Sequence, residues 1–126
     1  MELFVNNNGT IVSAEQPVVT ARNRSFRYGD ALFESIRFTN SQPQFLKEHL
    51  QRLFTGMKVL KMQKDNLYSE SFFENAILEL ALKNSITTDG RIRLTVYRND
   101  GGLYTPDNNS TAYLIEITPL NDVGAP

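Results

Sequence analysis

The 126-residue chain contains no cysteine and a single histidine, His49. The lack of cysteine excludes a disulfide framework, a thiol nucleophile and a cysteine metal site, and it is typical of a cytoplasmic protein. A single histidine also excludes a metal site built from several histidines of one chain. No apolar run approaches the ~20 residues that span a bilayer. Residues 1–5 lack the basic start and long apolar core of a signal peptide.

Charge of one sign is also lacking, because the formal net charge is only −1. No bulk electrostatic field therefore favours nucleic acid or an acidic membrane, and we expect neither as a partner. Hydrophobic residues make up 40% of the chain and charged residues 21%. These values are typical of a globular protein, and the length fits one domain of ordinary size.

The first half of the chain carries strand patterns around a long irregular stretch. We expect a hairpin from residues 3–5 and 10–12, a loop over 13–30, a strand over 32–38 and a short returning strand at 44–46. The strand over 32–38 alternates clearly. One of its faces carries Leu32, Glu34, Ile36 and Phe38, and the other carries Phe33, Ser35 and Arg37.

Two helices and two further strands follow. Apolar residues spaced by three and four predict a helix over 47–62, with a stripe of Leu46, Leu50, Leu53, Met57 and Leu60. Ser71 and Glu74 resemble a capping box at the start of a second helix that ends near Asn84. We expect a strand over 91–98, a polar loop over 99–109 and a last strand within 111–120.

The order of these elements predicts an α+β fold. Adjacent strand pairs favour an antiparallel or mixed sheet, with both helices packed on one face. Residues 1–120 would form this domain, and residues 121–126 would begin a linker. The parity of the strand over 91–98 places Arg91 and Arg93 on one face, which Arg98 would share only after a bulge.

Two strings resemble the N-terminal part of the class IV (fold-type IV) pyridoxal-phosphate enzymes. The first is Arg24-Ser-Phe-Arg-Tyr-Gly-Asp-Ala-Leu-Phe-Glu-Ser-Ile-Arg37, and the second is Phe45-Leu-Lys-Glu-His-Leu-Gln-Arg-Leu53. That family includes branched-chain and D-amino-acid aminotransferases and aminodeoxychorismate lyase. The resemblance runs from Arg24 to Leu60 and, more loosely, from Arg91 to Tyr104. It implies pyridoxal 5'-phosphate (PLP) as the cofactor and the small N-terminal domain of these enzymes as the fold.

The resemblance also assigns roles to individual residues. By spacing alone Arg52 is an ordinary helix arginine, but its position in His-x-x-Arg-Leu implies that it binds the phosphate of PLP. Tyr28 and Phe33 match aromatic residues that line the substrate pocket, Tyr28 often across a dimer interface. Arg93 matches an arginine on the carboxylate side of branched-chain aminotransferase pockets. His49 we interpret as a packing or hydrogen-bonding residue, and Tyr28-Gly-Asp30 by itself predicts a tight turn.

The same comparison assigns no catalytic residue to this chain. In the family, the lysine that forms a Schiff base with PLP and the acidic partner of the pyridine nitrogen come from the C-terminal domain. We therefore expect that domain to be absent here and the chain alone to be inactive. No lysine of the chain matches the family's position, and all lie on predicted helices or their edges: Lys47, Lys58, Lys61, Lys64 and Lys83.

The resemblance implies a homodimer that moves an amino group between an amino acid and a 2-oxo acid. Aminodeoxychorismate lyase is an alternative within the family. Some members carry Arg-Gly-x-x-x-Arg at the end of the strand that corresponds to 91–98, and the second arginine is absent from Arg98-Asn-Asp-Gly-Gly-Leu103. The absence of this arginine weakens the assignment of the chain to a lyase or to a D-amino-acid transaminase. An alternative of another class is a non-catalytic α+β binding or dimerisation module, which the length of the native open reading frame would distinguish.

Overall fold

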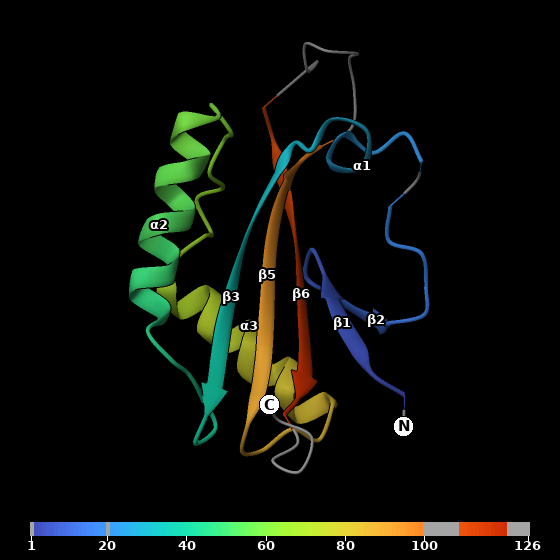
Figure 1. Ribbon diagram of the computed structural model, residues 1–126, viewed down its shortest axis with the longest axis vertical. Coiled ribbons are helices and arrows are strands. Elements are labelled where there is room, and N and C mark those ends of the chain that lie inside the picture. Colours follow the sequence, from blue (N-terminus) through green and yellow to red (C-terminus); the bar gives the residue numbers. More distant parts are fainter. Residues whose placement is uncertain (1, 20, 100–108, 121–126) are drawn as a thin grey trace.

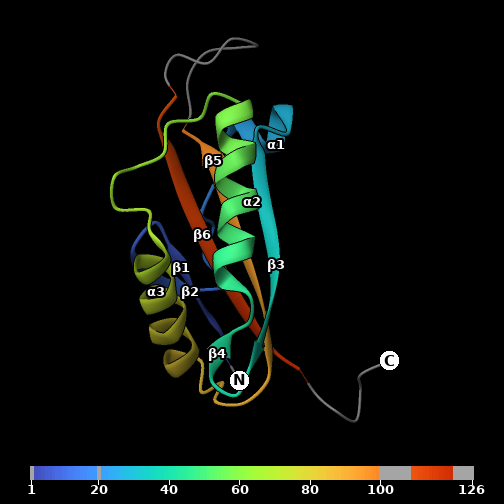
Figure 2. The same ribbon diagram turned by 90° about the vertical axis from the view of Figure 1, so that its left-hand side faces the viewer.

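The computed structural model describes residues 2–19, 21–99 and 109–120. These residues form an α+β layer in which one antiparallel sheet carries two long helices on the same face (Figures 1 and 2). The strands are β1 (Phe4–Asn7), β2 (Thr10–Ser13), β3 (Ala31–Thr39), β4 (Gln42–Pro43), β5 (Gly90–Arg98) and β6 (Thr111–Pro119), and the helices are α1 (Arg24–Tyr28), α2 (Leu46–Val59) and α3 (Glu70–Lys83). The predicted fold class is confirmed.

The sheet has the order β2-β1-β6-β5-β3-β4, and every neighbouring pair is antiparallel. Of the two predicted alternatives, an antiparallel or a mixed sheet, the antiparallel sheet is the one observed. The long strands β3, β5 and β6 form its centre, and their register places Ile36 beside Ile92 and Ile92 beside Ile117. Both of the alternations predicted for β3 and β5 are confirmed by burial.

Two predicted elements have wrong boundaries. The returning strand after the turn is Gln42–Pro43, because Phe45 adopts a left-handed backbone (φ 57°) and α2 already begins at Leu46. The second helix begins two residues earlier than the Ser71 box indicates. Ser69 is its N-cap, and the Ser69 hydroxyl accepts a hydrogen bond from the Phe72 backbone N–H at 3.1 Å. The Ser71–Glu74 pattern therefore indicated a helix start two residues after the actual one.

The core lies between the two long helices and one face of the sheet. Helix α2 contributes Leu46, Leu50, Leu53 and Met57, and α3 contributes Phe73, Ile77, Leu80 and Ala81. These side chains pack on the inward residues of β3, β5 and β6. Burying each of the larger ones contributes roughly 1.5–3 kcal/mol. Of the predicted α2 stripe, only Leu60 is outside this core, because the helix has already ended.

The stretch predicted as a loop over 13–30 contains one helical turn, α1, at the end of the sheet where β3 begins and β5 ends (Figure 1). Asn23 caps it by accepting a hydrogen bond from the Ser25 N–H at 3.0 Å. Gly29 ends it in a left-handed conformation (φ 65°), which glycine adopts without steric cost. The polar loop over 99–109 lies mostly outside the described residues, and the expected linker over 121–126 lies wholly outside them. No helix within the described ranges is long and apolar enough to cross a membrane.

Candidate functional site

The sheet face opposite α2 and α3 carries two of the residues that the sequence singled out. Phe33 on β3 and Arg93 on β5 both point to this open face, and the Arg93 guanidinium lies 4.1 Å from the centre of the Phe33 ring. The ring is 54% exposed although it is a large aromatic side chain. A guanidinium at this distance is attracted to the ring and is held in a defined place. Phe33 and Arg93 are therefore in direct contact on the open face of the sheet.

Further cationic side chains continue this open face along the sheet. The Arg91 guanidinium lies 3.3 Å from the Ser35 hydroxyl, and Arg37 lies 3.6 Å from the Asp89 carboxylate. Arg91 and Arg93 are two residues apart on the same strand and share the face. The face thus offers an aromatic wall beside several guanidinium groups, an arrangement suited to a carboxylate-bearing ligand.

Arg52 lies on the other side of β3, where it is bound to a buried carboxylate. The Arg52 Nε is 3.1 Å from both Glu34 oxygens, and Arg52 Nη2 is 2.7 Å from Glu34 Oε1. His49, one turn earlier on α2, places its Nδ1 2.7 Å from the same oxygen. His49 therefore has the hydrogen-bonding contact that we expected of it. Glu34 thus binds both side chains of the His-x-x-Arg string.

The charges in this cluster reinforce each other. Burial works to raise the pKa of Glu34, but hydrogen bonds from Arg52 and His49 outweigh it and hold that pKa below its usual value. The hydrogen bonding between Arg52 and Glu34, together with the Coulomb attraction of the carboxylate, raises the pKa of Arg52. Glu34 is therefore ionised at neutral pH and fixes the orientation of a charged guanidinium.

The geometry of Arg52 fits a phosphate group. Its side chain is 72% exposed, although two of its nitrogens are bound to Glu34. A guanidinium has five N–H donors in a rigid planar fork, so donors remain for a ligand on the outward side. An arginine that is both oriented and accessible loses little conformational freedom when it binds an anion.

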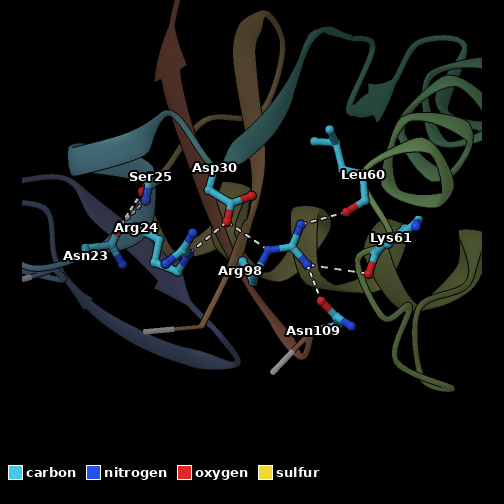
Figure 3. Close-up of polar contacts among 8 residues, drawn as sticks. All are labelled: Asn23, Arg24, Ser25, Asp30, Leu60, Lys61, Arg98 and Asn109. Atoms are coloured by element: carbon cyan, nitrogen blue, oxygen red, sulfur yellow. Dashed lines mark hydrogen bonds and ion pairs between the residues drawn. The ribbon is translucent and has the colours of Figure 1, made fainter. Parts of the chain in front are cut away.

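Tyr28 is placed by a different element, the short helix α1. The Arg24 guanidinium lies 4.8 Å from the centre of its ring. The Asp30 carboxylate, just beyond the helix, accepts hydrogen bonds from Arg24 Nε at 3.0 Å and from Arg98 Nε at 2.8 Å (Figure 3). The turn predicted at Tyr28-Gly-Asp30 is present, but the Asp30 side chain joins two arginines instead of only closing the turn.

Three charged residues that bind side chains of this region were not among the site residues predicted from the sequence: Glu34, Asp30 and Arg98. The signal for two of them was available, because Glu34 and Arg98 occupy core-facing positions of alternating strands. A charged residue at such a position must find a partner, since an unpaired buried charge is costly. The strand β5 continues without a bulge to Arg98, which pairs with Thr111, so Arg98 lies on the face opposite Arg91 and Arg93.

The lysines of the chain lie on the surface. Lys64 is placed over the ring of Phe54 and Lys83 over the ring of Phe4. All five side chains are exposed: Lys47, Lys58, Lys61, Lys64 and Lys83. None of the three ion-paired carboxylates of the described residues, Asp30, Glu34 and Asp89, is bound to a lysine. None of these five lysines is therefore buried in an apolar pocket, the setting that would activate a lysine as a nucleophile.

Comparison with known proteins identifies several chains that are similar to this one. A probable branched-chain-amino-acid aminotransferase of Aquifex aeolicus is 33% identical over 122 residues, which are 92% of this chain and 36% of the relative. The solved branched-chain amino acid aminotransferase of Escherichia coli matches 95% of this chain and 42% of its own, with 25% identity and a TM-score of 0.83. A hypothetical aminotransferase of Mycobacterium tuberculosis, solved in its PLP-bound form, shares the fold at 19% identity with a TM-score of 0.75, over 94% of this chain and 40% of its own.

The chain thus spans a little over a third of the length of the curated relative. Its fold is that of the N-terminal domain of branched-chain aminotransferases. The family model described as amino-transferase class IV matches residues 31–123, which include β3, α2 and β5. On the strength of this match, the chain belongs to the class IV aminotransferase family.

Proposed function

We propose that this domain belongs to an enzyme that transfers an amino group between an amino acid and a 2-oxo acid, with PLP as its cofactor. The observation that carries the proposal is the state of Arg52, whose guanidinium is fixed by Glu34 and yet 72% exposed. The relatives in the comparison are aminotransferases, which supports amino transfer over the lyase alternative. PLP is the cofactor that the family implies, and the fold neighbour from M. tuberculosis was solved in its PLP-bound form.

In this proposal Arg52 would hold the phosphate group of PLP, and PLP would supply the electron sink that amino transfer requires. Phe33 and Arg93 would bind the substrate side, the ring as a wall and the guanidinium as a partner for a carboxylate. Tyr28 would complete the pocket from the end of the sheet. The catalytic lysine would come from residues outside this chain. The homodimer stays a prediction from the resemblance, and the cytoplasmic location stays a prediction from the lack of cysteine.

The test uses the protein at its native length, assayed for amino transfer from branched-chain amino acids to a 2-oxo acid at increasing PLP. We expect Arg52→Ala to raise the PLP concentration for half-maximal activity by about tenfold or more, because a charge-assisted hydrogen bond is lost. The PLP concentration for half-maximal activity of Arg52→Lys should lie between the values of wild type and Arg52→Ala, since a lysine keeps the charge without the planar donor fork. Arg22→Ala, an exposed arginine before α1, is the control and should behave as wild type.

Two outcomes would contradict the proposal. One is a native-length protein that transfers no amino group at saturating PLP. The other is an Arg52→Ala variant with an unchanged PLP requirement. The 126-residue chain serves as a further check on the missing lysine. After incubation with PLP and borohydride reduction, mass spectrometry should find no specific lysine of this chain carrying the cofactor.

A further inference from the structure

A buried ion cluster lies at the end of the sheet and is not part of the pocket assigned above. Its centre is Asp30, whose carboxylate contacts Arg24 and Arg98 at 3.0 and 2.8 Å. The side chains are 14%, 4% and 6% exposed, respectively. Two guanidinium groups therefore share one carboxylate in a place with little access to water (Figure 3).

Arg98 uses its other donors to connect separate parts of the chain. Its Nη2 donates to the Leu60 carbonyl at 2.7 Å, at the end of α2, and its Nη1 donates to Asn109 Oδ1 at 2.7 Å and lies 3.4 Å from the Lys61 carbonyl. The Arg98 backbone N–H also donates to the Asp30 carbonyl at 3.2 Å. The cluster thus joins α1, the start of β3, the end of β5 and the end of α2.

Such a cluster is poorly explained by stability alone. Desolvating three charged groups costs about as much as their mutual attraction returns, so buried ion pairs give little net stabilisation. An apolar residue at Arg98 would continue the buried row of Ile92, Leu94 and Val96 and would satisfy the strand pattern. What an apolar residue cannot do is donate the hydrogen bond by which Arg98 holds the Asp30 carboxylate, directly after the end of α1.

Tyr28 is the residue whose place depends on this direction. Arg24 and Tyr28 are the first and last residues of α1, four apart and therefore on one side of the turn. The Arg24 guanidinium is held at one edge by Asp30 and faces the Tyr28 ring at 4.8 Å. The Asp30 backbone N–H donates to the Arg24 carbonyl at 3.4 Å, which closes the end of the turn.

We propose that Asp30, Arg24 and Arg98 are positioning residues that hold the Tyr28 ring in place for substrate binding. Asp30 orients Arg24, Arg24 orients the ring, and Arg98 anchors Asp30 to the end of the sheet. The role of Tyr28 as a substrate wall rests on the proposed function, whereas the placement of the ring by the cluster does not.

The placement is tested on the 126-residue chain with 3-fluorotyrosine and ¹⁹F NMR. The chain has five tyrosines, and Tyr28→Phe assigns the signal of residue 28. We expect Asp30→Asn and Arg24→Lys to move this signal toward that of a solvent-exposed tyrosine. The signals of the buried Tyr68 and Tyr113 should stay in place and report that the core is intact.

Arg37→Lys is the matched control, because Arg37 is an ion-paired arginine at the opposite end of β3. It should leave the Tyr28 signal unchanged. If Asp30→Asn disturbs the core signals, Arg24→Lys carries the test, since it keeps the charge beside Asp30 and removes only the planar group over the ring. An unmoved Tyr28 signal in a folded Arg24→Lys variant would overturn the placement.

The substrate role is tested at native length. Asp30→Asn should raise the KM for the amino acid by about tenfold and change kcat much less, since a wall contacts the ground state and the transition state alike. The PLP requirement should not change. A moved ¹⁹F signal with an unchanged KM would overturn the substrate role, while a wild-type protein without amino transfer would refute the proposed function and leave the placement standing.

Discussion

At the scale of single residues, Glu34 decides what Arg52 can do. It lies on the inward face of β3 among Leu32, Ile36 and Phe38, where the alternation predicts an apolar side chain. Its carboxylate is accommodated because Arg52 and His49 occupy its lone pairs. The exposed arginine is thereby oriented by an acid that is almost completely buried. The strand pattern shows that Glu34 needs a partner, but it does not show that Arg52 is that partner.

This pairing has a consequence for the pH dependence of stability. The pKa of Glu34 in the folded protein lies below its ordinary value of 4.5, because the hydrogen bonds from Arg52 and His49 outweigh the opposing effect of burial. The unfolded state therefore takes up protons first as the pH falls. The stabilisation is complete above the unfolded pKa and is lost as the pH falls through the folded one. Denaturant unfolding between pH 6 and pH 3 should show this decline.

Glu34→Gln should make the decline less steep, since the variant has no carboxyl group at this position to titrate. Glu48→Gln is the control, because Glu48 is an exposed acid on the same helix as Arg52. It should retain the wild-type slope. A Glu34→Gln variant with the full wild-type slope would show that other carboxylates, Asp30 first among them, account for the acid sensitivity.

At the scale of elements, the strands were easier to predict than the helix ends. Period-two alternation in β3 and β5 reflects burial of one sheet face, and burial acts on every residue of the strand. A helix start depends on one or two hydrogen bonds, which several residues of similar type can supply. Ser69 and Ser71 are equally good caps by composition, and the backbone of Ser69 alone is extended as an N-cap requires.

Ser69→Ala should therefore lower the free energy of unfolding by about 1 kcal/mol, the usual cost of losing an N-cap. The Phe72 N–H would lose the acceptor that it has at 3.1 Å. Ser71→Ala, two residues along on the first turn, should change stability by only a few tenths of a kcal/mol, because alanine is the better helix former. Urea titration of both variants measures the difference. Equal losses would mean that the capping box at Ser71 operates in solution.

In the candidate site too, strand patterns predict which face a residue lies on, but they do not predict contacts between distant segments. Phe33 and Arg93 could be placed on one face from parity alone, and their contact follows from the β3–β5 register. The link from Asp30 to Arg98 joins residues 68 apart and depends on where β5 ends relative to α1. Local patterns carry no information about such a pairing, so the cluster emerges only from the folded chain.

At the scale of the whole molecule, the sheet separates the two parts of the candidate site. Arg52 and Glu34 lie on the helix side of β3, while Phe33 and Arg93 lie on the open face. Adjacent residues of a strand point to opposite sides, so Phe33 and Glu34 place the two parts back to back. A cofactor held by Arg52 would therefore lie on the other side of the sheet from Phe33 and Arg93.

Both parts depend on one core, and the core can be tested with two leucines of α3. Leu80 is fully buried, and Leu82, two residues along, is 74% exposed. Leu80→Ala removes the same atoms as Leu82→Ala but leaves a cavity among the side chains of α2, α3 and the sheet. It should lower the free energy of unfolding by about 3 kcal/mol and the Tm by roughly 10 °C. Leu82→Ala should stay within about 0.5 kcal/mol of wild type.

Because a single core joins both helices to the sheet, the Leu80→Ala loss should appear equally in every probe. Far-ultraviolet circular dichroism, to which α2 and α3 contribute, and tyrosine fluorescence, to which the buried Tyr68 and Tyr113 contribute, should give the same lowered midpoint. Two separate transitions would mean that α3 detaches before the sheet unfolds. The Arg52–Glu34 pair on α2 and β3 would then survive the loss of α3, and the two parts of the site would depend on different portions of the domain.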